Sequence, residues 1–327
     1  MICPICNNVN EKEQVVCSIC GWNFAEDVTM HRILFSDIQI AEYQRRICEY
    51  NDDRLSSEQR DTEEENEREV LSYFKKRTDY LLSDPAFQRA KELNEERYTG
   101  GRDLERVFRE QWGLVSIRRD GYRQEIYRRI SNGTFEDLHV GDYFHVTMEN
   151  GETVRLVLAE FGAKLERLYD IREQIVDNYA ILIPAHCFAA SESMDKRKKM
   201  ILFSELSMSY EESYMHEEVL PHYAQMLQKA LNYRILHRED EKELRLLTYT
   251  NLYGSTQYSM KGFALFEKEA EARYAALGIE GTKRCAYWLA DESNDIMEGW
   301  ESKYRTNENE WVSSLKKLGV RPYFYIG

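Results

Sequence analysis

The sequence has no apolar run long enough to cross a membrane and no surplus of positive charge. No stretch approaches the roughly 18 apolar residues of a membrane-spanning helix, and the chain starts with cysteines rather than with a basic-then-apolar signal. It has 44 lysines and arginines against 58 aspartates and glutamates, a formal net charge of -14. Because phosphate contacts need a basic surface, this balance argues against broad nucleic-acid binding. We expect a cytoplasmic protein whose thiols stay reduced.

The common catalytic signatures are missing as well. The sequence contains no H-E-x-x-H motif, no G-x-S-x-G motif and no phosphate-binding loop. Its 7 histidines are scattered along the chain. His186 and Cys187 are neighbours, but neighbouring residues on a strand point to opposite faces, so this pair does not form a catalytic dyad. We therefore expect a protein that is not an enzyme.

Four cysteines near the start form two C-x-x-C pairs, Cys3 with Cys6 and Cys17 with Cys20. Two intervening residues let a tight turn aim both sulfurs at one point, and a short hairpin between the pairs brings the two turns together. Four thiolates make a tetrahedral site that suits zinc. Rubredoxin-like iron is an alternative, and a redox dithiol is less favoured because pairs so close together favour one shared ion. The sequence predicts a structural Zn²⁺ ribbon over residues 1–27, which metal binding would fold.

Three further cysteines stand alone in the sequence: Cys48, Cys187 and Cys285. None has a partner at a spacing typical of metal sites. Free cysteine behaves as a small hydrophobic residue and is often buried. We therefore expect all three to be small buried side chains.

Residues 28–130 carry helical spacings and are predicted to be a helical spacer or packing region. Asp84 caps a helix that has Pro85 in its first turn, and a short helix runs from Asp103 to Trp112. The apolar positions are too irregular for a long coiled coil, so the helices pack on each other or on the next domain, or mediate self-association. The arginines from Arg118 to Arg129 form a weak basic patch that acids elsewhere balance. Nucleic acid is therefore an unfavoured partner.

Residues 131–327 change to the alternation of strands. Asn150-Gly151 predicts a hairpin with a type I′ turn, which needs positive φ at both positions. "YAILIPA" is typical of a buried strand, and "HEEVLPHYAQMLQKALN" predicts a helix with Pro221 near its start. "YRILH", "YWLA" and "VRPYFYI" are short strand candidates. The fold class predicted for this domain is mixed α+β.

Five motifs follow each other in this half: "ISNGTFEDLHVGDYF", "ILIPAHCF", "EEVLPHYAQMLQKALNYRILHRED", "YWLADES" and "LGVRPYFYIG". In this order they resemble a bacterial and phage domain family of uncharacterised function, some of whose members look like the variable proteins of diversity-generating retroelements. The resemblance implies a C-type-lectin-like fold, related to that of formylglycine-generating enzymes. Two positions depart from the family, where an arginine is Ala290 here and the alanine of "PAF" is Tyr323.

The resemblance also implies a binding surface between Trp288 and Val320. Large aromatic rings combined with short polar side chains make good contact surfaces. The segment is rich in Glu and Lys, which favours a fixed partner as much as a diversified site. For the tryptophans the alternative is packing in the core. The implied ligand-binding residues are Trp288, Asp291, Ser293, Asn294, Trp300, Tyr304, Asn307, Asn309 and Trp311.

Formylglycine-generating enzymes use a close pair of cysteines, and this half of the chain offers only Cys187 and Cys285, neither in a matching motif. The likeness of fold therefore does not carry catalysis with it. We predict a non-enzymatic binding protein in phage or anti-phage biology, with a zinc ribbon for docking and a C-terminal surface that recognises a protein partner. The alternatives are a divergent enzyme on the same fold and a structural component of a phage.

Overall fold

A curled antiparallel sheet with helices around it makes up the described part of the chain, so the predicted α+β class is confirmed at this level. The computed structural model describes residues 83–112, 121–166, 175–188, 201–203, 209–236, 243–254, 261–276, 279, 283–292, 303–313 and 317–327. Several residues singled out from the sequence lie outside these ranges: Cys3, Cys6, Cys17, Cys20, Cys48, Arg118, Ser293, Asn294 and Trp300.

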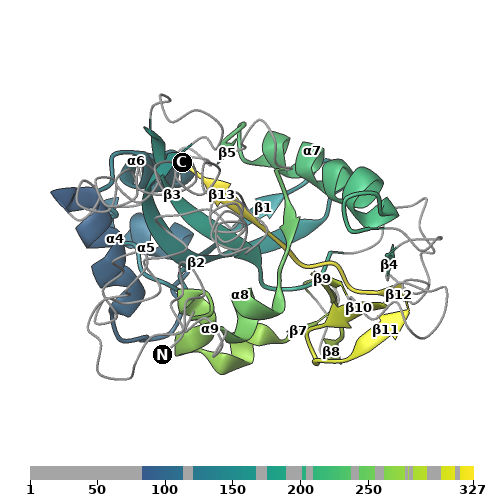
Figure 1. Cartoon of the computed structure of the whole chain (residues 1–327). Helices are drawn as coiled ribbons and strands as arrows, with labels where there is room; N and C mark the ends of the chain where they lie inside the picture. Colours follow the sequence, from purple (N-terminus) through teal and green to yellow (C-terminus); the bar gives the residue numbers. More distant parts are fainter. Residues whose placement is uncertain are drawn as a thin grey trace, which may run out of the picture.

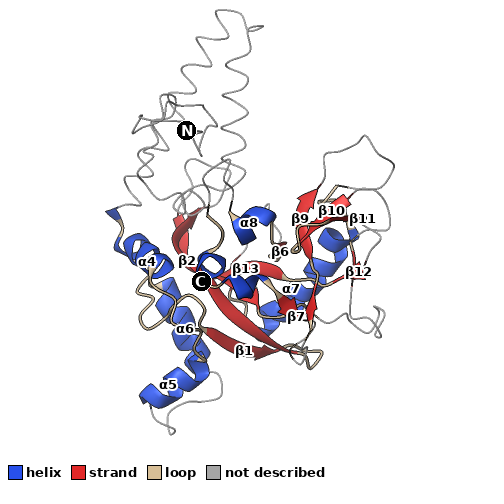
Figure 2. Ribbon diagram, turned by 90° about the horizontal axis from the view of Figure 1, so that it is seen from below, coloured by secondary structure: helices blue, strands red, loops and turns tan. Residues whose placement is uncertain are grey.

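Three helices precede the sheet: α4 (Pro85–Glu95), α5 (Leu104–Trp112) and α6 (Gly121–Ser131). The predicted start of α4 is confirmed, because a side-chain oxygen of Asp84 accepts hydrogen bonds from the backbone N–H groups of Ala86 at 2.9 Å and Phe87 at 3.2 Å. These bonds satisfy amides that have no partner inside the helix. Both views of the molecule place α4, α5 and α6 together on one side (Figures 1 and 2).

These helices share one hydrophobic core with the sheet. Asn94 fixes α4 to the second strand, since its side chain donates to the carbonyl of Phe161 at 2.7 Å and accepts from the N–H of Phe161 at 2.8 Å. Ile126 and Ile130 of α6 are completely buried in the same cluster as Phe161. The cluster therefore crosses the boundary predicted at residue 130 without interruption.

The main sheet brings the end of the chain into its middle (Figure 1). Strand β13 pairs antiparallel with β3, Phe324 opposite Leu182, and also with β5 and β6. Register shifts along β2 and β3 mark bulges, which bend and twist a strand and so curl the sheet. In spatial order the strands are β1 (Tyr143–Thr147), β2 (Thr153–Glu166), β3 (Ile175–Pro184), β13 (Pro322–Ile326) and β5 (Ile235–Leu236), with β6 (Arg245–Leu246) pairing beside β5 on β13.

The hairpin between β1 and β2 forms where it was predicted, but with a different turn. Gly151 has a φ of 81°, whereas Asn150 does not have a positive φ, so the type I′ turn is wrong. The side-chain oxygen of Asn150 accepts from the N–H of Glu152 at 3.0 Å, and the N–H of Gly151 bonds the carbonyl of Met148 at 2.9 Å. Asparagine can mimic a backbone turn in this way, and only the glycine then needs the left-handed conformation.

The remaining elements pack around the main sheet. A π-helical turn, η1 (Met215–Val219), runs into α7 (Leu220–Ala230), with Pro221 in the first turn of α7 as predicted. A small antiparallel sheet has the order β11 (Trp311–Ser313), β10 (Lys303–Thr306), β9 (Trp288–Glu292), and lies at the opposite end of the molecule from α4 to α6 (Figure 2). The short elements are β4 (Ile201–Leu202), α8 (Tyr249–Tyr253), α9 (Ala264–Lys268), η2 (Ala270–Arg273), β7 (Ala275–Ala276), β8 (Arg284–Cys285) and β12 (Lys317–Leu318).

Within the described ranges, no helix has both the length and the apolar character that a membrane span requires.

The predicted basic patch on α6 is largely taken up by internal contacts. The side chains of Arg128 and Arg129 both donate to Glu125, with Nε to oxygen distances of 2.7 and 2.8 Å. Arg129 is buried as well, with its guanidinium over the ring of Phe108. The hydrogen bond from Arg128, supported by that from Arg129, lowers the pKa of Glu125 to about 2.

Substituting Glu125→Gln should make the free energy of unfolding depend less on pH in the acid range. The pKa of Glu125 in the folded chain lies below its ordinary value of 4.5, so its charge stabilises the fold above that pH and the contribution is lost as the pH falls toward about 2. We expect the variant to be less stable by roughly 2 kcal/mol at neutral pH. Its free energy of unfolding, measured by urea titration, should fall less steeply through the acid range.

The matched control is Glu110→Gln. Glu110 is 73% exposed and lies 3.8 Å from Arg106 on the surface of α5, so its loss should change the free energy of unfolding by less than about 0.5 kcal/mol. Equal acid slopes in the wild type and in Glu125→Gln would show that this carboxylate does not contribute as described.

Candidate functional site

The small sheet of β9, β10 and β11, with the turn between β10 and β11, carries the six described residues that the sequence assigned to a binding surface, but Trp288 is not exposed on it. Its side chain has 0% exposure. Its ring lies edge-on to that of Phe203, with the centroids 5.1 Å apart. Trp288 therefore belongs to the core, the alternative considered from the sequence, and its assignment to the contact surface is wrong.

Asn307 is also buried, and its bonds show that it organises the backbone here. The residue has 1% exposure. Its side-chain oxygen accepts from the N–H of Tyr287 at 2.8 Å, and its own N–H donates to the carbonyl of Tyr287 at 3.2 Å. Its carbonyl accepts from the hydroxyl of Tyr253 at 2.8 Å. Asn307 thus joins the end of β10 to the approach to β9 and to α8, instead of contacting a partner.

The exposed residues of the predicted set are Trp311 and Asn309. Trp311 is 44% exposed, which is unusual among the large apolar side chains of the described ranges. Asn309 has a φ of 65° in the turn between β10 and β11, a conformation that asparagine tolerates better than most residues. Asp291 is half-buried, and only the backbone of Tyr304 is described, paired with Glu292 and Val312.

Arg305, which the sequence did not single out, lies at the centre of this surface. Its guanidinium carbon is 3.6 Å from the ring centroid of Tyr249 and 5.4 Å from that of Trp311. Its Nε donates to the side-chain oxygen of Asn309 at 2.8 Å. Arg305 and Trp311 are direct cross-strand partners, so recognising the hairpin at residues 307–310 would have placed them side by side. The contact with Tyr249 is long-range and left no signal in the sequence.

The stack continues through a second tyrosine to a second arginine. The rings of Tyr249 and Tyr253 have centroids 4.7 Å apart, and the guanidinium carbon of Arg273 lies 4.9 Å from the centroid of Tyr253. Cations over aromatic faces are attracted by the negative charge of the ring face. We call this set the aromatic–arginine row: Trp311, Arg305, Tyr249, Tyr253 and Arg273.

The electrostatics of the row leave the charge of Arg305 available. Among the described residues, Arg305 makes no ion pair, and its hydrogen bonds go to Asn309 alone. Burial raises the pKa of Asp291, although the hydrogen bond from the N–H of Tyr249 and, less strongly, the charge of Arg305 act to lower it. Asp291 also accepts the N–H of Tyr249 at 2.6 Å, which fixes the start of α8 beside β9. The arrangement suits recognition of a group with an acceptor oxygen next to an apolar surface.

The N–H of Tyr287 depends on Asn307 for its partner, so Asn307→Ala should destabilise the fold. Removing the side chain leaves that N–H without an acceptor next to a completely buried side chain. We expect the free energy of unfolding to fall by roughly 1 to 3 kcal/mol, measured by chemical denaturation. Glu308→Ala, at an exposed neighbouring position, is the control and should change little. A stable Asn307→Ala protein would mean that this bond is not needed.

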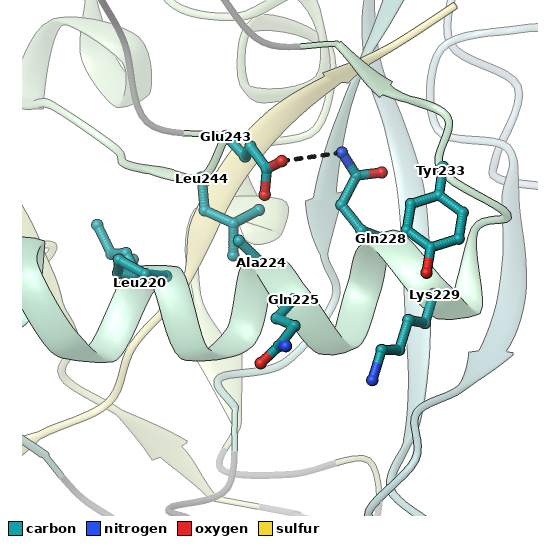
Figure 3. Close-up of a pocket in the computed structure, with 9 residues that line it drawn as sticks. Leu220, Ala224, Gln225, Gln228, Lys229, Tyr233, Glu243 and Leu244 are labelled. Atoms are coloured by element: carbon teal, nitrogen blue, oxygen red, sulfur yellow. Dashed lines mark hydrogen bonds between the residues drawn. The ribbon is translucent and has the colours of Figure 1, made fainter.

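A pocket beside α7 is a second candidate. It has a volume of about 460 Å³ and is lined by Leu220, Pro221, Ala224, Gln225, Gln228, Lys229, Tyr233, Glu243 and Leu244. Figure 3 shows Gln228 and Glu243 facing each other across it, joined by a hydrogen bond of 3.0 Å. The amide of Gln228 also bonds the backbone of Ile235, at 3.1 and 3.2 Å. The side chain of Gln228 is therefore engaged within the protein.

Cys187 and Cys285 lie together, although their positions in the sequence predicted two isolated cysteines. The sulfurs of Cys187 and Cys285 are 3.5 Å apart. Cys187 is completely buried, as predicted, whereas Cys285 is only half-buried. His186 is buried too, and burial, with the nearby charge of Arg321, lowers its pKa to about 4. In the part of the chain that the structure describes, no group of three or more His, Cys, Asp or Glu side chains is arranged to hold a metal ion.

Comparison of this chain with protein-family models, with curated proteins and with solved structures finds no match. The aromatic–arginine row combines the exposed ring of Trp311 with an arginine that has no ion pair among the described residues.

Proposed function

We propose that the chain is a non-enzymatic binding protein that recognises a protein partner through the aromatic–arginine row. The observation that carries this proposal is Arg305, which stacks between Trp311 and Tyr249 without an ion pair in the described ranges. Trp, Tyr and Arg are the residue types that dominate the binding energy of protein interfaces. Their gathering at one place on an acidic chain is therefore the best indication of a contact site.

The geometry of Arg305 favours tight recognition. A guanidinium has five N–H donors, and Asn309 engages only those on Nε and one terminal nitrogen. The remaining donors suit a carboxylate or carbonyl of the partner. Because the two rings and Asn309 already hold the side chain, little rotamer entropy is lost on binding. Trp311 supplies apolar area beside the charge.

The C-terminal domain and the N-terminal cysteine pairs have separate roles in this proposal. The ordered motifs of residues 131–327 and the curled antiparallel sheet support a C-type-lectin-like domain, and the same motifs support a place in phage or anti-phage biology. Residues 1–27 serve as the docking module in this proposal. The donor set of Cys3, Cys6, Cys17 and Cys20 fits structural zinc, because two C-x-x-C pairs supply four soft thiolates. Zinc bound there would fold the ribbon and take no part in chemistry.

Substituting Arg305→Ala or Trp311→Ala should weaken capture of the partner by roughly 30-fold or more. Arg305→Lys should also bind weakly, because an ammonium neither stacks nor forms a planar fork. The full chain, immobilised, would be exposed to an extract of the cells that carry it, and retained proteins would be quantified by mass spectrometry. The partner is then the protein retained by the wild type and lost with all three variants.

The control for this experiment is Tyr233→Ala. Tyr233 is 71% exposed at the pocket beside α7, outside the row, so its loss should leave capture unchanged. Thermal unfolding of each variant would confirm that the domain is folded. Unchanged capture by the Arg305 and Trp311 variants would overturn the assignment, and loss with Tyr233→Ala alone would move the site to the pocket.

The zinc proposal makes a separate prediction. The full chain should carry one zinc per molecule by elemental analysis, and Cys17→Ser with Cys20→Ser should abolish it because two thiolates are too few for a tetrahedral site. Cys187→Ser with Cys285→Ser is the matched control, again two substituted cysteines, and should keep the zinc. Retention of zinc in the first variant, or its loss in the second, would place the metal elsewhere.

A further inference from the structure

Cys187 and Cys285 are far apart in the sequence, and one short strand holds both. The N–H of Cys187 donates to the carbonyl of Ala276 at 2.9 Å. Cys285 is the antiparallel partner of Ala275. Consecutive residues of β7 thus fix the backbones of the two cysteines, and the sulfurs are 3.5 Å apart. This anchoring keeps two thiols in contact without relying on local sequence.

The contact is enclosed on the side of Cys187 and open on the side of Cys285. Cys187 has 0% exposure, and Gly319 packs so closely that a Cβ at that position would lie 2.7 Å from its sulfur. Cys285 is half-buried, so a small reagent can reach it. The pair therefore has one accessible sulfur and one sheltered sulfur, as expected of an attacking and a resolving thiol.

A buried positive charge lies beside the pair. Arg321 has 2% exposure, and its hydrogen bonds in the described ranges all go to neutral acceptors: the carbonyls of Pro184 and Ala272, each at 2.8 Å, and the hydroxyl of Tyr287 at 3.4 Å. A buried cation without a carboxylate is costly, and a thiolate nearby would supply the missing negative charge.

The two thiols differ in acidity in the direction that such a charge would favour. The hydrogen bond with Cys187 lowers the pKa of Cys285, and the charge of Arg321 lowers it further, although burial opposes both. Burial raises the pKa of Cys187 well above its usual range. The accessible sulfur is thus the one that ionises first, and the thiolate is the form that reacts with oxidants.

From this geometry we infer that Cys187 and Cys285 form a reversible disulfide in response to a peroxide, with Cys285 as the attacking thiol and Cys187 as the resolving thiol. The Cys285 thiolate attacks one oxygen of hydrogen peroxide, the O–O bond breaks, and the departing hydroxide takes up a proton to become water. Cys285 is then a sulfenic acid. The sulfur of Cys187 attacks it, the S–O bond breaks, and the proton of Cys187 leaves with the oxygen as a second water.

The electrons balance over these two reaction steps. The two sulfurs together lose two electrons, and one peroxide molecule gains them. A dithiol reductant reverses the reaction through a mixed disulfide at Cys285, returning two electrons and two protons. The inference does not depend on the aromatic–arginine row, and failure of either proposal leaves the other standing.

The test treats the full, zinc-loaded chain with hydrogen peroxide, blocks the remaining thiols and maps the digest by mass spectrometry. The expected result is a peptide pair joined through Cys187 and Cys285, which dithiothreitol separates. Glutathione in a parallel tube shows that the peroxide is active. Recovery of both cysteines as free thiols, or pairing of Cys285 with any other cysteine, would overturn the inference.

Single variants test the order of events. In Cys187→Ser, the Cys285 sulfenic acid should persist and be trapped by dimedone. In Cys285→Ser, oxidation of Cys187 should be at least about tenfold slower, because its thiol is buried and stays protonated. Equal rates at the two positions would refute the assignment of roles. If either variant fails to fold, the peptide mapping of the wild type still decides whether the disulfide forms.

Discussion

The pairing of β13 with β3 is the interaction on which the rest of the structure depends. Phe324 lies opposite Leu182 at the centre of the sheet, and both side chains are completely buried. The same strand also pairs with β5 and β6, so the last residues of the chain close the sheet from within. Pairings this distant in sequence carry a large loop-closure entropy, which only the burial of many apolar side chains can offset.

Arg321, the residue before β13, shows what this closure requires. Its guanidinium bonds the carbonyl at the end of β3 and the carbonyl of Ala272, and lies near the rings of Phe266 and Tyr287. These contacts satisfy its donors but not its charge. A thiolate at Cys285 would supply the negative charge that these neutral acceptors lack.

The parts of the fold that the sequence predicted are those that local chemistry decides. Asp84 and Pro85 start a helix by bonds within a few residues, and the alternation of β1 follows from its one buried face. The predicted turn type at Asn150 was wrong because the side chain of Asn150 accepts a hydrogen bond from the backbone N–H of Glu152. Local signals of this kind determine elements, and they do not determine which elements meet.

The candidate site depends on contacts between elements that are distant in the sequence. Trp288 and Asn307 are residue types that are common on contact surfaces. Only the packing of β9 and the hydrogen bond to Tyr287 show that both side chains are buried. Arg305 gained its role from Tyr249, on a distant helix. Cys187 and Cys285 looked isolated because a strand far from Cys187 in sequence holds both. Residue type alone therefore identified the region of the site but not its members.

Tyr287 is hydrogen-bonded both to the aromatic–arginine row and to Arg321, which lies beside the cysteine pair. Its backbone bonds Asn307, whose carbonyl holds Tyr253 of the aromatic–arginine row. Its hydroxyl donates to the carbonyl of Arg273 at 2.6 Å and accepts from Arg321. Cys285 lies two residues before it on the same segment. Through these bonds Tyr287 contacts the row at Arg273 directly and at Tyr253 by way of Asn307, and it contacts Arg321 on the side of the cysteine pair.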